Sequence, residues 1–217
     1  MPRAPDKNPV LQEIRKAFDQ PSLRSPKPQA LSSLEIRNGR KTSHWIWWVW
    51  PSLDPVRKTS RPQYSLRNLA DVQAFLSDPG LRKNLYEITE VALNHLQKGV
   101  PAGTLFGSRT DVEKFGETAT CFALASLEAR DLQLAELMMS CLEALGGLHK
   151  ETVKYLVSEG VSIASHSSDI DLDSLRDALA RLQETTPSSD PERAEAGAEA
   201  GAEEAAEPAA ELPEAAA

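Results

Sequence analysis

The sequence predicts an all-α fold, with one compact multi-helix domain followed by a disordered acidic tail. Apolar residues recur three and four positions apart through most of the chain, as on one face of a helix. No run of β-branched residues alternates with polar ones at hairpin spacing. The C-terminal segment consists almost wholly of Ala, Glu, Gly and Pro. We therefore divide the chain into a flexible N-terminus (1–8), a helical domain (9–185) and a tail (186–217).

Apolar periodicity defines the expected helices in chain order. They cover residues 10–18, 30–36, 69–76, 81–96, 115–124, 134–145, 153–157 and 172–182. Proline-rich loops are expected at 21–28 and 51–62, and a polar loop at 167–169.

Capping residues place several helix boundaries. Asn68 or Ser65 can cap the helix at 69–76, and Asp131 and Asp171 can cap later ones. Residues 110–113 have the Thr-x-x-Glu pattern of a capping box, and the segment 105–108 before it should be a turn. Helix ends are expected at Pro21, Asn38-Gly39, Pro79-Gly80, Gly99, Gly146-Gly147 and Gly160.

Charge is distributed unevenly along the chain. Residues 1–62 hold twelve basic and five acidic residues, residues 63–186 hold eleven and eighteen, and the rest of the chain carries the net charge of −8. We expect the first two parts to pack together and neutralise each other. The acidic tail and the neutral domain argue against nucleic-acid binding.

Cysteine and histidine usage predicts no metal site and no cofactor. Cys121 and Cys141 lie within apolar helical patterns, which predicts free, buried thiols in a reducing compartment. The four histidines lack metal-ligand spacing. The N-terminus has no apolar signal core, and no apolar run approaches the roughly 20 residues that span a bilayer. We therefore expect a soluble, intracellular, cytoplasmic protein.

All four tryptophans fall within six residues, directly after a basic segment. Trp45, Trp47, Trp48 and Trp50 follow Gly-Arg-Lys-Thr-Ser-His at positions 39–44. A helix starting at Thr42 or Ser43 and a strand both fit this stretch, and periodicity leaves the choice open. The tryptophans can equally be core side chains that contribute buried area.

This segment is the candidate ligand site. Its candidate binding residues are Arg40, Lys41, Ser43, His44, Trp45 and Trp48. Arg40 and Lys41 can hold an anion, Trp45 or Trp48 can stack on a planar group, and His44 is the candidate acid or base. The expected ligand is a small anionic molecule resembling a nucleotide or sugar phosphate, and Ser108, Arg109 and Asp111 could approach it.

Other functions also fit the sequence. A protein-interaction module without catalytic activity is the main alternative, with the helix at 172–182 docking onto a protein partner. The sequence does not decide whether the chain is an enzyme, nor its oligomeric state.

The run GRKTSHWIWWVWP resembles the GRKxSHWMWF-x-FPQ motif of the family catalogued as domain of unknown function 1810. Further matches occur in the same order: Ala30-Leu31 through Gly39, Tyr64-Ser65-Leu66, Ala74-Phe75-Leu76 with Pro79-Gly80-Leu81-Arg82, Glu87 and Thr89, Leu105-Phe106-Gly107, Asp111, Lys114-Phe115, Thr120, Phe122, Gly147 and Thr152. The resemblance covers most of residues 9–157 and implies a small all-α fold without supplying a substrate.

The chain departs from the family pattern at three places. Ser52 stands where the family has Gln, the segment 54–60 replaces a Gly-Leu-Gly-x-Ser loop, and Thr118-Ala119 replaces a pair of serines. Any family activity that uses those residues would be altered here. Members of the family are often labelled calpastatin, a disordered inhibitor, which does not fit a chain patterned for folding.

Overall fold

The computed structural model describes residues 8–19, 28–161 and 170–185. Within these ranges the regular elements are helices, and one isolated parallel bridge joins Leu53 to Leu66. This confirms the all-α prediction. The predicted tail at 186–217, most of the N-terminus at 1–8, nearly all of the loop at 21–28 and the loop at 167–169 lie outside the described residues.

The helices follow the predicted order, with short elements added. They are α1 (Pro9–Asp19), α2 (Pro28–Arg37), α3 (Ile46–Val49), the 3-10 turn η1 (Pro62–Tyr64), α4 (Leu69–Leu76), α5 (Pro79–Gln97), α6 (Ala102–Phe106), α7 (Arg109–Glu128), α8 (Leu132–Leu145), α9 (Lys150–Ser158) and α10 (Leu172–Glu184). The additions include η1, which begins at the last residue of the predicted loop at 51–62, and α6. The predicted turn at 105–108 is wrong in its first half, because Leu105 and Phe106 belong to α6.

Most predicted helix caps are confirmed. The side chains of Asn68, Asp131 and Asp171 each accept the backbone N–H of the residue three positions later. The predicted capping box at residues 110–113 is wrong. Ser108 caps α7 instead, with its Oγ accepting the N–H of Asp111 at 3.1 Å. Since α6 ends at Phe106, only Gly107 and Ser108 separate the two helices, and α7 starts earlier than predicted.

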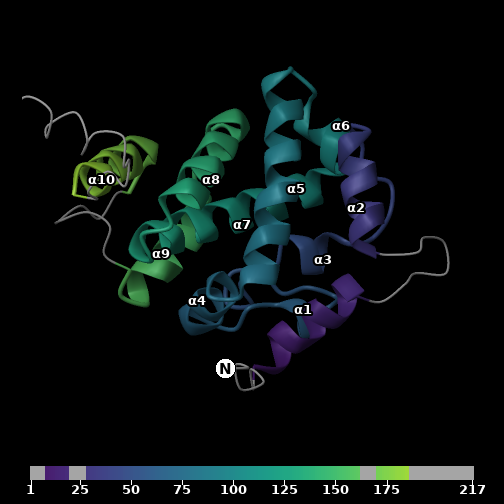
Figure 1. Ribbon diagram of the computed structural model, residues 1–217, viewed down its shortest axis with the longest axis horizontal. Helices are drawn as coiled ribbons and strands as arrows, with labels where there is room; N and C mark the ends of the chain where they lie inside the picture. The colour runs from purple at the N-terminus through teal and green to yellow at the C-terminus, as the bar shows by residue number, and fades with distance from the viewer. Residues whose placement is uncertain (1–7, 20–27, 162–169, 186–217) are drawn as a thin grey trace, which may run out of the picture. The chain divides into compact units, whose positions relative to one another are not determined.

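Helix α7 forms the centre of the core. Every residue from Glu117 to Leu127 is buried, and the helix contacts α4, α6, α8 and α9. Figure 1 shows α7 running behind α5, with α8 beside it. A helix buried on all sides has no solvent face, so its polar side chains need partners within the protein. The charged residues Lys114 and Glu117 in its first half therefore depend on the segments that pack on them.

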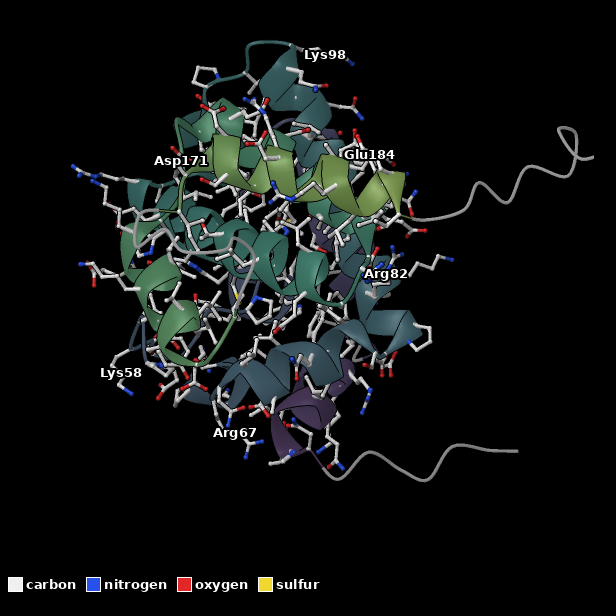
Figure 2. The ribbon with its side chains drawn as sticks, turned by 90° about the vertical axis from the view of Figure 1, so that its left-hand side faces the viewer. Lys58, Arg67, Arg82, Lys98, Asp171 and Glu184 are labelled. Atoms are coloured by element: carbon white, nitrogen blue, oxygen red, sulfur yellow. The ribbon has the colours of Figure 1, made fainter. Side chains whose placement is uncertain are left out.

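Ion pairs join the positive N-terminal third to the negative remainder. Arg15 pairs with Asp78, Lys41 with Asp111 and Arg57 with Glu117. These contacts support the expectation that the two parts pack together and neutralise each other. Other charged side chains point away from the helices, as Figure 2 shows for Lys58 and Lys98.

The predicted burial of the two cysteines is confirmed. Cys121 and Cys141 are free and buried, and burial raises the pKa of both thiols well above the ordinary value. None of the described helices is both long enough and apolar enough to cross a bilayer.

Candidate functional site

The segment before the tryptophans is a loop built around a buried carboxylate. Glu35, near the end of α2, accepts hydrogen bonds from the backbone N–H groups of Thr42 and Ser43, the Ser43 hydroxyl and the Trp45 indole. Burial by itself would raise the pKa of Glu35, but these four donors outweigh it and lower the pKa to about 2. The loop then enters α3 at Ile46, so neither a helix from Thr42 nor a strand forms.

The start of α7 fixes the other side of this loop. The N–H of Lys41 donates to the carbonyl of Leu105 at 2.7 Å. Gly107 follows with φ of +81°, and a Cβ there would lie 2.8 Å from the Lys41 carbonyl oxygen. Only glycine combines that dihedral angle with that approach. The loop therefore rests directly on the backbone between α6 and α7.

The four tryptophans divide into two pairs. Trp45 and Trp50 belong to the core: both are buried, and their indole N–H groups bond Glu35 and the Thr89 hydroxyl. Trp47 and Trp48 are half-buried, and their indole nitrogens are enclosed without a hydrogen-bond partner among the described residues. The core interpretation thus holds for one pair, and the other pair packs against the core while remaining partly exposed.

Two lysines, Lys41 and Lys114, share the carboxylate of Asp111. Lys41 Nζ lies 2.6 Å from Asp111 Oδ2, and Lys114 Nζ lies 3.9 Å from Asp111 Oδ1. The side chains of Lys41 and Lys114 are 6% and 11% exposed. Burial lowers the pKa of Lys114; the Asp111 and Glu117 carboxylates oppose this shift, whereas the charges of Arg57 and Lys41 add to it. The pair of lysines therefore has more positive charge than its single carboxylate balances.

A second carboxylate nearby is already neutralised. Arg57 Nε donates to both oxygens of Glu117, at 2.7 and 2.9 Å, and its NH2 group reaches Glu113 at 3.3 Å. His149 Nε2 lies 3.7 Å from Glu117, while its Nδ1 accepts the N–H of Thr152 at the start of α9. Glu117 is therefore engaged mainly by Arg57, although its charge still opposes the lowering of the Lys114 pKa.

Three cationic or titratable groups surround the Trp47 ring. Lys114 Nζ lies 4.8 Å and Arg61 Cζ 5.8 Å from the ring centroid, and the His44 ring centroid lies 6.3 Å away. Arg61 and His44 are exposed and have no carboxylate partner within the described ranges. We call Trp47, His44, Arg61 and Lys114 the Trp47 cluster. It combines an aromatic wall with unbalanced positive charge.

The structure uses the predicted site residues in different ways. Of the six, His44 belongs to the Trp47 cluster. Lys41 is held by Asp111 beside it, and Ser43 and Trp45 bind Glu35.

The remaining two predicted residues are Arg40 and Trp48. Arg40 is exposed, and its side chain forms no ion pair within the part of the chain that the structure describes. Trp48 packs against Tyr64 at 5.5 Å between ring centroids. The prediction did not include Trp47, Arg61 or Lys114. Local spacing could not identify Arg61 and Lys114 as the cations on the Trp47 ring, because both lie too far from Trp47 in the chain.

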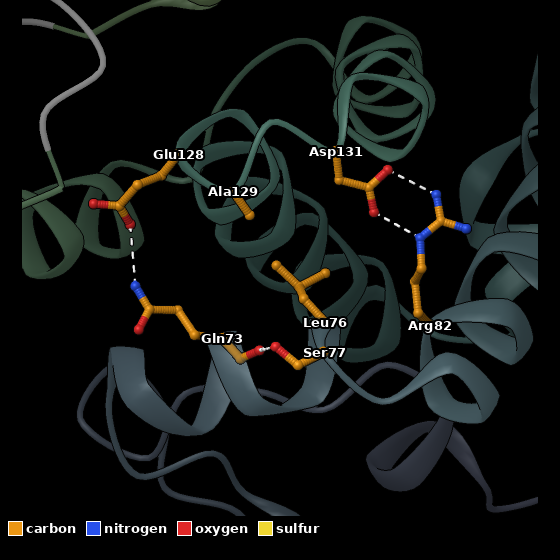
Figure 3. Close-up of a pocket in the computed structure, with 7 residues that line it drawn as sticks. All are labelled: Gln73, Leu76, Ser77, Arg82, Glu128, Ala129 and Asp131. Atoms are coloured by element: carbon orange, nitrogen blue, oxygen red, sulfur yellow. Dashed lines mark hydrogen bonds and ion pairs between the residues drawn. The ribbon is translucent and has the colours of Figure 1, made fainter. Parts of the chain in front are cut away.

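A surface cavity of about 350 Å³ lies elsewhere, between the C-terminal ends of α4 and α7. Figure 3 shows Arg82 facing Asp131, with Gln73 reaching Glu128. The guanidinium bonds both Asp131 oxygens at 2.6 and 2.7 Å, and Gln73 donates to Glu128 at 3.4 Å. These polar groups already satisfy each other, so the cavity offers a ligand less unpaired charge than the Trp47 cluster.

Within the described ranges, no three His, Cys, Asp or Glu side chains gather as metal ligands would.

Comparisons with known proteins identify one family. A family model described as "Protein of unknown function (DUF1810)" matches residues 27–154, more than half of the chain. Among solved structures, a conserved hypothetical protein from Mycobacterium tuberculosis is 25% identical, with a TM-score of 0.48; the match covers 58% of this chain and 86% of that one. No curated protein matches. The residues that match the family model include both the tryptophan segment and the first half of α7.

Proposed function

The chain belongs to the DUF1810 family of proteins of unknown function, and from its geometry we propose that it binds a small anionic ligand at the Trp47 cluster. The ligand class is a phosphate-bearing planar or sugar-like metabolite, such as a nucleotide or a sugar phosphate. The surface formed by His44, Arg61 and Lys114 around one half-buried aromatic ring supports this assignment.

One observation carries the proposal: Asp111 is the sole carboxylate within 4 Å of two buried lysines, among the described side chains. Lys41 takes that carboxylate at 2.6 Å and leaves Lys114 at 3.9 Å without a hydrogen bond. A buried charge that lacks a close counterion is costly, and an anionic ligand would supply one. The exposed guanidinium of Arg61 adds a second donor on the same ring.

Each residue of the cluster has a role that its chemistry suits. Arg61 can hold two phosphoryl oxygens at once through its planar guanidinium. Lys114 contributes positive charge next to the Trp47 ring. The indole ring of Trp47 can stack on a planar group of the ligand or contact it with its edge. His44 is placed to donate a hydrogen bond, and it is the residue that would move a proton if binding leads to a reaction.

A thermal-shift screen of the full chain tests the proposal. The panel holds inorganic phosphate, AMP, ATP, ADP-ribose and glucose 6-phosphate. A ligand at 100 times its dissociation constant stabilises the fold by about 2.7 kcal/mol, which is several degrees for a domain of this size. We expect Arg61→Gln and His44→Gln to reduce the shift. Arg40→Gln and Lys83→Gln, which remove exposed charges outside the cluster, should keep it.

A flat response over the whole panel, from a folded protein, would overturn the proposal. Equal losses in Arg61→Gln and Lys83→Gln would also count against it, because the effect would then come from net charge alone. The alternative of a protein-interaction module lacks a comparable observation. The large exposed apolar side chains found in the described residues, Leu34 and Val157, lie on different helices.

A further inference from the structure

Lys114 differs in its surroundings from the exposed lysines of the described chain. Its side chain is 11% exposed, whereas those of Lys58 and Lys83 are 79% and 71% exposed. It makes no hydrogen bond within the described residues, and its closest carboxylate oxygen is 3.9 Å away on Asp111. Its amine faces the Trp47 ring at 4.8 Å.

These surroundings make the ammonium ion of Lys114 less stable than that of an exposed lysine, so the neutral amine is easier to form here. An ammonium group needs hydrogen-bond acceptors or water, and the side chains around Lys114 provide no acceptor at hydrogen-bond distance among the described residues. Three positive groups are close: Lys41 shares its carboxylate, Arg57 acts on it from the loop after the tryptophans, and Arg61 lies on the same Trp47 ring. The Asp111 and Glu117 carboxylates act in the opposite direction but do not outweigh burial and these charges. A lysine desolvated beside other cations is the arrangement that makes an amine nucleophilic.

We propose that Lys114 forms a reversible imine with the carbonyl group of an anionic ligand held at the Trp47 cluster. This inference rests on the proposed function, because the cluster must first hold the anionic part of the ligand. It narrows the ligand class to anionic aldehydes and ketones, such as oxo acids or phosphorylated aldehydes. Arg61 and His44 hold the negative group, and the carbonyl carbon is directed toward the amine.

The step balances without an outside oxidant or reductant. The Lys114 nitrogen attacks the carbonyl carbon, and a proton passes from nitrogen to the former carbonyl oxygen. That oxygen takes a second proton from the same nitrogen and leaves as water while the carbon–nitrogen double bond forms. The Asp111 carboxylate, 3.9 Å from the amine, is placed to carry the proton. Hydrolysis reverses the step.

Borohydride trapping of the full chain tests the imine. Pyridoxal 5′-phosphate, an anionic aldehyde, is added below one equivalent, the imine is reduced, and modified lysines are located by peptide mapping. Pyridoxal, which lacks the phosphate group, is the matched control. We expect Lys114 to carry most of the label despite its burial, with at least about a tenfold preference for the phosphorylated probe, the size of one charge-assisted contact. Label spread over Lys58 and Lys83 in proportion to exposure would overturn the proposal.

Two variants separate this inference from the proposed function. Lys114→Arg keeps the charge but cannot form an imine, and Lys83→Arg makes the same change at an exposed site. Stabilisation by inorganic phosphate is measured on both. Phosphate stabilisation with Lys114 unlabelled in the unmodified protein would refute the imine and leave anion binding standing. Neither stabilisation nor labelling would refute both. Mapping on the unmodified protein decides the question even if Lys114→Arg does not fold.

Discussion

Lys41 and Asp111 lie 70 positions apart in the chain, and their side chains form a 2.6 Å ion pair at the first turn of α7. Lys41 comes from the basic run before the tryptophans, and Asp111 from the segment that also carries Lys114. These are two of the segments by which the chain resembles its family. Their meeting brings two lysines to one carboxylate, with Lys114 over the Trp47 ring and Lys41 over the Trp45 ring.

Replacing Asp111 with Asn should destabilise the fold. The change leaves Lys41 and Lys114 buried without a carboxylate, and breaking a buried pair in this way costs about 3 kcal/mol. Asp54→Asn is the matched control, because it breaks the Lys58–Asp54 pair, in which Lys58 is 79% exposed. That control should cost less than about 1 kcal/mol. Urea unfolding of both variants measures the difference, and equal losses would show that burial does not strengthen the Asp111 pair.

Glu35 should make stability depend on pH in the acid range. Its pKa in the folded protein is about 2, against an ordinary value of 4.5. The ionised carboxylate therefore stabilises the fold fully above about pH 4.5, and this contribution is lost as the pH falls toward 2. The two values differ by an amount worth roughly 3 kcal/mol.

The Glu35→Gln variant isolates this effect. At neutral pH its free energy of unfolding should be lower than that of the unmodified protein by roughly 3 kcal/mol, and the gap should narrow below about pH 4.5. Denaturant unfolding at a series of pH values measures both curves. A gap that stays constant from neutral pH down to about pH 2.5 would mean that Glu35 does not titrate with a lowered pKa.

Gly107 and Gly103 should respond in opposite ways to alanine. At Gly107 a methyl group would meet the Lys41 carbonyl oxygen at 2.8 Å, and φ is +81°. Strain of this kind costs about 1–3 kcal/mol. At Gly103, in α6, a methyl group would meet no atom of the described residues within 4 Å, so alanine there should be neutral or stabilise by about 0.5–1 kcal/mol. The thermal midpoints of the two variants measure this difference. Equal midpoints would contradict the close approach of residue 107 to the Lys41 carbonyl oxygen.

The two cysteines should resist thiol reagents in the folded protein. Both thiols are buried, and burial raises their pKa, so little thiolate is present at neutral pH. A thiol-reactive dye should label neither in native buffer and both in denaturant. Rapid labelling of Cys121 or Cys141 without denaturant would show that the core around α7 and α8 opens easily.

Local sequence patterns were sufficient for most of the fold. Helix spacing and the capping residues Asn68, Asp131 and Asp171 identified the main helices, because both signals depend on residues a few positions apart. The start of α7 was misplaced, since Thr110 and Ser108 are both plausible caps by residue type and the structure uses Ser108. The short helix α6 has too few residues for a periodic signal.

The site was harder to predict than the fold. Composition picks out His44 and the tryptophan segment as candidates, and their part in ligand binding stays a prediction. The use of Ser43 and Trp45 to bind Glu35 was not, because it depends on how the loop folds back onto α2. In the sequence Lys114 lies in a charged stretch with Asp111, Glu113 and Glu117, and nothing local places it on Trp47. Long-range contacts, not residue types, decide which cations remain unbalanced.

The most direct measurement follows the four indole N–H resonances by NMR while phosphate-bearing ligands are added. They report four different environments. The indole N–H groups of Trp45 and Trp50 donate hydrogen bonds within the core. Trp48 packs on Tyr64, and the Trp47 ring contacts the Lys114 amine. Substitution of each tryptophan by Phe assigns its resonance. Anion binding at the cluster predicts that the Trp47 resonance shifts on saturation while those of Trp45 and Trp50 stay in place. A bound ligand that leaves Trp47 unmoved, or a full panel that moves no indole resonance, would contradict anion binding at the Trp47 cluster.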